Sequence, residues 1–133
     1  MRRYVLDANA LLNYIDQRPH GARVATMLKE AARAHQPLLM SAVNWGEVLY
    51  LLWRSQGESY VSRLIAGVKQ LPMRIEPANE EDAFHAARLK AIHKVPYADS
   101  FAAALAIRER ATLVTSDPDF ERLGKTVPIV WLK

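Results

Sequence analysis

The chain has 133 residues, of which half are apolar and about a quarter are charged, a composition typical of a globular protein. It contains no cysteine, which excludes disulfides, thiol catalysis and cysteine-based zinc sites and favours a reducing environment. The net charge of +4 is compatible with a polyanionic partner but does not require one. At this length we expect one domain over residues 1–133.

Short apolar runs alternate with helical patterns along the chain. In chain order we expect a strand over 4–6, a helix after Asp7, a helix over 22–35, a strand over 38–40, helices over 45–53 and 59–71, a strand over 73–75, a helix starting at Asn79–Glu80, a helix over 97–110, a strand over 112–115, a short helix over 117–123 and a strand over 128–131. This alternation indicates an α/β fold with a parallel sheet covered on both faces.

The N-terminal segment and the lengths of the apolar runs bear on location. No apolar run approaches the length that spans a membrane. Asp7 interrupts the first apolar stretch too early for a signal peptide. We therefore expect a cytoplasmic protein without a membrane partner.

Four acidic residues fall where an α/β sheet gathers its functional groups. Asp7 follows the first strand directly, and Asp117 lies just beyond the fourth strand. Glu47 lies in the first turns of the helix after the second strand, and Asp99 lies in the first turn of the helix before the fourth strand. Because functional residues gather at the carboxyl ends of parallel strands, we expect these four carboxylates to converge there.

Each acid also has a structural interpretation. Asp7 and Asp117 are typical helix N-caps, the second because proline follows it. Asn44 and Glu47 have the spacing of a capping box, and Asp99 suits the positive end of a helix dipole. Together these interpretations weaken, because two unit charges about 4 Å apart repel by about 4 kcal/mol at an effective dielectric constant of about 20, whereas a cap contributes about 1 kcal/mol. Four converging carboxylates therefore require a cation.

The chemistry of the donors indicates which cation. Oxygen ligands without cysteine suit Mg²⁺ or Mn²⁺, and the four histidines show no metal-binding spacing. A carboxylate site with one or two such ions is typical of phosphodiester hydrolysis, in which the metal lowers the pKa of water and stabilises the attacked phosphate. Asn9, Thr115 and Ser116 are polar neighbours that we expect to orient Asp7, Asp117 or the attacking water.

Four stretches together resemble one known family. They are VLDANALL near the N-terminus, SAVNWGEVLY, PYADSFAAALA and LVTSDPDFE. In this order and spacing they resemble the PIN domain, and most closely the VapC-type toxins of prokaryotic toxin–antitoxin pairs. The resemblance spans essentially the whole chain, and none of the four acids departs from the family pattern.

The resemblance implies a three-layer α/β/α fold around a five-stranded parallel sheet of order 3-2-1-4-5, and a Mg²⁺- or Mn²⁺-dependent endoribonuclease activity. The metal-binding acids of the family fall on Asp7, Glu47, Asp99 and Asp117. Its polar auxiliary residues fall on Thr115 and Asn9, and Asp119 in the last motif ranks second to the four acids. Family members usually form homodimers and are held inactive by an antitoxin, so we expect a VapB-type antitoxin partner.

Two further expectations concern the surface. Arg88 and Lys94 precede Asp99 and are candidates for holding the RNA backbone, whereas Arg2 and Arg3 belong at the opposite edge of the sheet. The aromatic residues of segment 44–64 either pack on the sheet or form the dimer and antitoxin face, and the sequence favours neither role. These aromatic residues are Trp45, Tyr50, Trp53 and Tyr60.

Other functions fit the residues less well. A phosphoacceptor signalling domain needs an aspartate at the end of the third strand, where Glu76 stands, and a lysine after the fifth, where only Lys133 is available. An Asp-x-Asp phosphatase would find Asn9 at its second position. A catalytically inactive RNA- or protein-binding module on the same fold is the alternative, although such a module gains nothing from mutually repelling acids.

Overall fold

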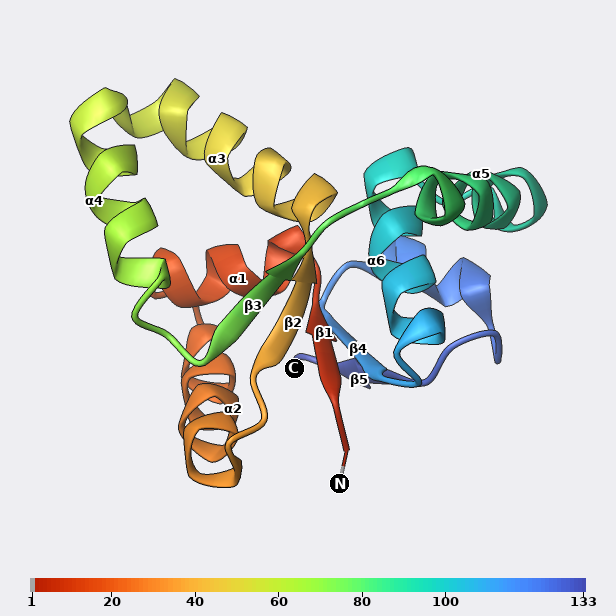
Figure 1. Cartoon of the computed structure of the whole chain (residues 1–133), viewed down its shortest axis with the longest axis horizontal. Coiled ribbons are helices and arrows are strands. Elements are labelled where there is room, and N and C mark those ends of the chain that lie inside the picture. Colours follow the sequence, from red (N-terminus) through yellow and green to blue (C-terminus); the bar gives the residue numbers. More distant parts are fainter. Residues whose placement is uncertain (1) are drawn as a thin grey trace.

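The computed structural model describes residues 2–133, in which a five-stranded sheet is covered by helices on both faces (Figure 1). The first part of the chain forms β1 (Tyr4–Leu6), α1 (Ala8–Ile15), α2 (Gly21–Ala34), β2 (Leu38–Ser41), α3 (Ala42–Gln56), α4 (Glu58–Val68) and β3 (Met73–Glu76). The second part forms α5 (Glu80–His93), α6 (Tyr97–Arg108), β4 (Thr112–Thr115), the 3₁₀ helix η1 (Pro118–Leu123) and β5 (Ile129–Trp131).

The strand order is β3-β2-β1-β4-β5, and every pair is parallel. β1 lies at the centre, where Val5 pairs with Leu39 of β2 and with Leu113 of β4. The chain builds the sheet outward from β1 to β3, then returns and continues on the other side of β1 with β4. This order confirms the predicted fold. It also makes β1 and β4 the topological switch point, where open α/β sheets place their binding sites.

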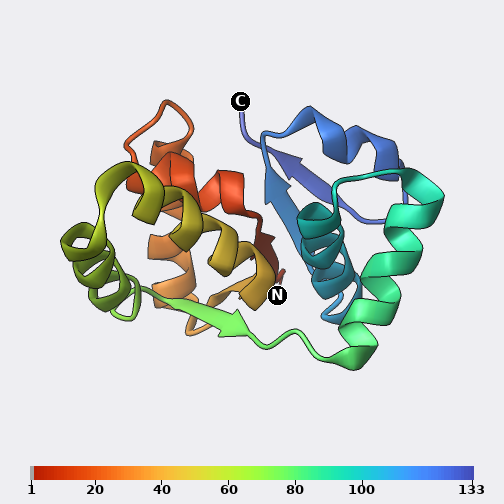
Figure 2. The same cartoon turned by 90° about the horizontal axis from the view of Figure 1, so that it is seen from above.

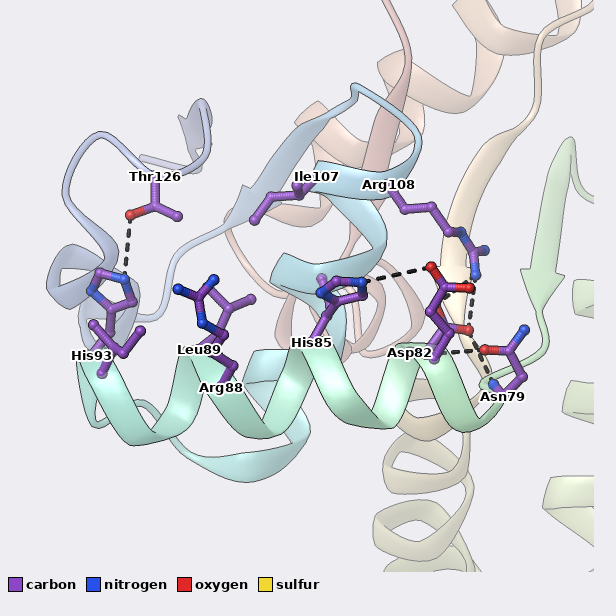
Figure 3. Close-up of a pocket in the computed structure, with 12 residues that line it drawn as sticks. Asn79, Asp82, His85, Arg88, Leu89, His93, Ile107, Arg108 and Thr126 are labelled. Carbon is purple, nitrogen blue, oxygen red and sulfur yellow. Dashed lines mark hydrogen bonds and ion pairs between the residues drawn. The ribbon is translucent and has the colours of Figure 1, made fainter.

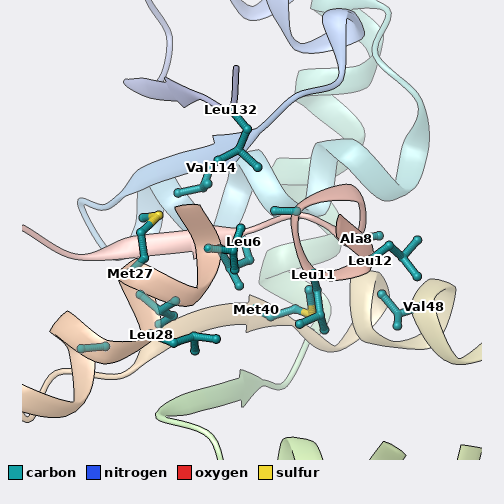
Figure 4. Packing of buried hydrophobic residues seen from close by; sticks show 14 of the residues in the cluster. Leu6, Ala8, Leu11, Leu12, Met27, Leu28, Met40, Val48, Val114 and Leu132 are labelled. Atoms are coloured by element: carbon teal, nitrogen blue, oxygen red, sulfur yellow. The ribbon is translucent and has the colours of Figure 1, made fainter. Parts of the chain in front are cut away.

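Successive residues of a strand point to opposite faces of the sheet, so each strand contributes to two cores. Leu6, Met40 and Val114 pack with the apolar side chains of α1 to α4 (Figure 4). Val5 and Leu113 pack on the other face with residues of α6 and η1. Figure 2 shows the resulting arrangement, with the red-to-green helices on one side of the sheet and the cyan-to-blue helices on the other. The molecule therefore has the three layers that were predicted.

Helix α3 begins at Ala42, three residues earlier than predicted, and its N-cap explains the difference. The helix begins at Ala42, because the Ser41 hydroxyl accepts the N–H of Val43 at 3.2 Å and satisfies the first turn. The capping-box interpretation of Asn44 and Glu47 is therefore wrong, and both residues lie inside the helix. The other predicted elements agree with the structure to within a few residues. Among residues 2–133, no helix is both long enough and apolar enough to cross a membrane.

The aromatic side chains of α3 and α4 divide between the core and the surface. Trp45 and Tyr60 pack against the core on the α1–α4 side of the sheet. Tyr50 is 57% exposed and Trp53 is 42% exposed. The packing role is therefore found for Trp45 and Tyr60, whereas an interface role for Tyr50 and Trp53 stays a prediction.

Candidate metal centre

Asp7 is the most buried acid of the candidate site. It follows β1 and caps α1, since its Oδ1 accepts the N–H of Ala10 at 2.7 Å, while Oδ2 accepts the Thr115 hydroxyl at 2.5 Å. The residue is only 2% exposed. Burial raises the pKa of Asp7 to about 7, the hydrogen bonds from Thr115 and Ala10 lower it, and the charges of Asp117 and Glu47 raise it. The carboxylate is thus both a helix cap and a member of a charged cluster.

The end of β4 is organised by a hydroxyl. Thr115 is fully buried, and its Oγ1 accepts the N–H of Asp117 at 2.9 Å while its hydroxyl donates to Asp7. Asp117 in turn caps η1, because its Oδ1 accepts the N–H of Asp119 at 2.9 Å and Pro118 occupies the first helical position. The cap predicted for Asp117 is therefore present, and the same residue faces the other acids.

Three carboxylates approach one another most closely. Oxygen atoms of Asp99, Asp117 and Asp119 all lie within 4.8 Å of each other, which is close enough to share one metal ion. Asp119 joins this group because the tight 3₁₀ turn after Pro118 folds it back toward its own cap. Asp119 was ranked below the four acids as a candidate site residue, but in the structure its carboxylate lies close to those of Asp99 and Asp117. Arg122, also on η1, lies 3.7 Å from Asp119.

The remaining acids are coupled to this group through their charges. Burial raises the pKa of Asp99 to about 7, with further contributions from the charges of Asp117, Asp7, Glu47 and Asp119. Burial and the charge of Asp117 also raise the pKa of Glu47. All four acids predicted from the sequence are thus brought within range of one another. We call these five residues the acid cluster.

Asn44 ties α3 to α6 beside the acid cluster. It is fully buried, and its Nδ2 donates to the carbonyl oxygen of Ala98 at 3.0 Å. Ala98 precedes Asp99, and Glu47 follows Asn44 by about one helical turn, so this bond joins the two helices close to the residues that carry the two acids. The Oδ1 of Asn44 is buried without a hydrogen-bond partner among the described residues. This bond between α3 and α6 was not predicted, because its only local signal is an asparagine inside a helix.

The side chains of Asn9 and Ser116 form a hydrogen bond with each other beside the acids. The Ser116 hydroxyl donates to Oδ1 of Asn9, and Asn13 donates to the same oxygen at 3.2 Å. No hydrogen bond among the described residues joins Asn9 to Asp7 or Ser116 to the Asp117 side chain. These two residues therefore connect the end of β4 to the first turns of α1, and their role toward the acids or a water molecule stays a prediction.

The basic residues considered for RNA binding lie in two places. Arg88 lines a cavity of about 460 Å³ between α5 and α6, and none of the acid cluster belongs to its described lining (Figure 3). Lys94 is the C-cap of α5 and has a left-handed backbone, with φ of 60°. Arg3 pairs with Glu109 at 2.9 Å, beyond the C-terminal end of α6, at the edge of the sheet away from the acids, as predicted. RNA binding by Arg88 and Lys94 stays a prediction.

The topology and the acid cluster agree with a comparison against protein families. The profile of the PIN domain matches residues 4–126. The chain belongs to the PIN domain family. The resemblance found in the sequence is therefore confirmed at the level of the family.

Several solved structures similar to this PIN domain come from toxin–antitoxin systems. VapBC2 from Rickettsia felis, bound to promoter DNA, has a TM-score of 0.79 and 19% identity over 98% of each chain. DNA-bound VapBC from Salmonella typhimurium has a TM-score of 0.78 and 16% identity over 100% of each chain. VapC20 from Mycobacterium tuberculosis, described as a sarcin–ricin loop cleaving toxin, has a TM-score of 0.68 and 16% identity over 91% of this chain and 95% of that chain. A search of curated proteins found no match to this chain.

Proposed function

We propose that this PIN domain is a metal-dependent endoribonuclease and the toxin of a type II toxin–antitoxin pair. The observation that carries this proposal is the acid cluster at the switch point of the sheet. Five carboxylates lie close together there, and burial and mutual repulsion raise the pKa values of three of them. Such an arrangement is costly for a protein that only binds a partner, and it is suited to a protein that binds a divalent cation.

The donor set suits a hard cation. Carboxylate oxygens are the ligands that Mg²⁺ and Mn²⁺ prefer, and Asp99, Asp117 and Asp119 would hold the ion, with Asp7 and Glu47 at its side. When bound, the ion would lower the pKa of a water molecule and offset charge on the attacked phosphate. The protein contributes orientation. Thr115 holds Asp7 and the backbone of Asp117 in one relative position, so little rearrangement is needed when substrate arrives.

The assignment as a toxin draws on the similar structures. Two of them are VapBC complexes and one is described as a sarcin–ricin loop cleaving toxin, and all are similar over nearly the whole chain. A cognate VapB-type antitoxin and a homodimer are therefore part of the proposal. Tyr50 and Trp53, exposed on α3, are candidates for the surface that such a partner covers. Cytoplasmic location follows from the same proposal.

The test is an RNA-cleavage assay with partner-free protein. Wild type and Asp7→Asn are incubated with total RNA in Mg²⁺, in Mn²⁺ and in EDTA, and the cut ends are mapped. We expect discrete fragments with wild type and metal only, since Asp7→Asn keeps the cap on Ala10 but removes a charge from the cluster. Folded, partner-free protein that cleaves no RNA in either metal would overturn the proposal and favour the RNA- or protein-binding module.

A further inference from the structure

The surface beside the acid cluster carries features that suit a single strand of RNA. Resting on the proposed nuclease function, we propose that Arg122, Lys94 and Tyr97 form a binding track for single-stranded RNA, in which the two cations hold backbone phosphates and the tyrosine ring stacks on a base. The track runs from η1, where Arg122 pairs with Asp119, across the C-cap of α5 to the first residue of α6.

Arg122 is the cation that contacts the acid cluster. Among residues 2–133, its pair with Asp119 is the only ion pair that reaches one of the five acids, and at 3.7 Å it is a loose one. The guanidinium also donates to the carbonyl oxygen of Lys94 at 2.9 Å, which anchors it in place. A guanidinium has five N–H donors in a flat fork, so donors are left over for the oxygens of a phosphate.

An acidic site that must admit a polyanion needs cations at its edge. The acid cluster alone would repel a phosphate backbone, because its charges are close together and partly shielded from solvent. Lys94 is exposed, and its ammonium makes no ion pair with any described residue. Because the Arg122 guanidinium bonds the carbonyl oxygen of Lys94, the two basic residues are neighbours in the fold. Phosphate contacts of this kind supply most of the affinity in non-specific nucleic-acid binding.

Tyr97 supplies an exposed ring at the start of α6. It is 48% exposed, and its ring contacts that of Phe101 in a T-shaped arrangement, with centroids 5.1 Å apart. The contact restrains the ring while about half of the residue stays open to solvent. Between Lys94 and Tyr97 lie Val95, which is fully buried, and Pro96, whose ring fixes φ. The backbone between the two residues is therefore held in place, which suits a stacking ring that follows a phosphate-binding cation.

The experiment measures RNA binding and metal binding on the same variants. A fluorescein-labelled single-stranded RNA of mixed sequence is titrated with protein in Ca²⁺, and its integrity is checked on a gel after each titration. The variants are Arg122→Gln, Lys94→Gln, Tyr97→Leu and Tyr97→Phe. Arg33→Gln is the matched control, because Arg33 is exposed at the far end of α2 and loses the same charge. Mn²⁺ affinity is measured by calorimetry without RNA.

We expect each cation variant to weaken RNA binding about fivefold at about 0.1 M salt and to reduce the slope of log K against log salt by about 0.7. Tyr97→Leu should weaken binding about tenfold, and Tyr97→Phe should restore it because the ring is kept. Arg122→Gln should bind Mn²⁺ at least as tightly as wild type, since a positive charge beside Asp119 is removed. A variant that is merely misfolded would lose affinity for both RNA and Mn²⁺.

The outcomes separate the track from the nuclease. If wild type cleaves RNA but the three substitutions bind RNA as tightly as Arg33→Gln, the track is wrong and the nuclease stands. If wild type cleaves no RNA but these substitutions still weaken binding as expected, the track is supported and the nuclease is wrong. Loss of Mn²⁺ affinity in Arg122→Gln would overturn the phosphate-binding role of that residue. Wild type that binds no RNA would overturn both proposals.

Discussion

The hydroxyl of Thr115 donates to the carboxylate of Asp7 at 2.5 Å, and this bond joins the ends of β4 and β1 across the switch point. The same oxygen accepts the N–H of Asp117, so one buried side chain serves two members of the acid cluster. Both groups would lose a partner if the hydroxyl were removed.

Thr115→Val should therefore lower both stability and RNA cleavage. The change keeps the volume of the side chain but leaves a buried carboxylate oxygen and a backbone N–H unpaired, which costs about 1–3 kcal/mol for each group. Thr115→Ser keeps the hydroxyl and should retain most of both properties. Urea unfolding and cleavage rates on the two variants provide the measurement, and a Thr115→Val protein with wild-type activity would contradict the positioning role.

The metal-free protein should lose stability as the pH rises toward neutrality. In the unfolded chain the carboxyls of Asp7 and Asp99 have the usual pKa of 3.8, whereas in the folded protein burial raises both to about 7. Between these values the folded state binds more protons than the unfolded state. The contribution to stability is thus complete below about pH 4 and is lost as the pH rises through about 7.

Asp99→Asn tests this dependence, because no hydrogen bond of its carboxylate among the described residues is lost with the charge. The melting temperature in EDTA should fall from about pH 5 to about pH 8 in wild type and should fall less in the variant. At about pH 8 the variant should melt higher than wild type, since repulsion within the cluster is relieved. If the melting temperatures of the two proteins depend on pH in the same way, the charges of the acid cluster do not act on Asp99.

Divalent metal should stabilise the folded protein by mass action. At about 100 times the dissociation constant, a single bound ion adds about 2.7 kcal/mol, which corresponds to several degrees in melting temperature for a domain of this size. Mn²⁺ or Mg²⁺ should also reduce the loss of stability between acid and neutral pH, because the cation offsets the repelling charges. A melting temperature that is independent of millimolar metal in wild type would count against the metal centre.

Asp119 should contribute to metal affinity, although the sequence ranked it below the four other acids. Its carboxylate oxygen lies within 4.8 Å of those of Asp99 and Asp117, so Asp119→Asn removes a charge from the tightest part of the cluster. We expect Mn²⁺ affinity to fall about tenfold, since affinity for hard cations follows the number of charged ligands. Glu121→Gln is the matched control, because Glu121 is an exposed acid on the same 3₁₀ helix. Equal Mn²⁺ affinity in the two variants would remove Asp119 from the site.

Much of the fold was predictable because its signals are local. The apolar runs predicted all five strands, and the caps at Asp7 and Asp117 were read from the residues that follow them. The order of the strands came from the resemblance to a family, since alternation of strands and helices alone is compatible with several orders. The capping box assigned to Asn44 was wrong because Ser41, three residues earlier, is a competing cap with the same local chemistry.

The amino-acid sequence by itself determined which residues end the strands and which acids stand there, because capping and strand formation involve neighbours along the chain. Only the tertiary structure decided which side chains meet. Thr115 and Asp7 are 108 positions apart, and Asn44 and Ala98 are 54 apart. Such contacts depend on the register of β1 against β4 and on how α3 packs against α6. A shift of one residue would turn every side chain of a strand to the other face, so these pairings follow from packing of the whole sheet rather than from any segment alone.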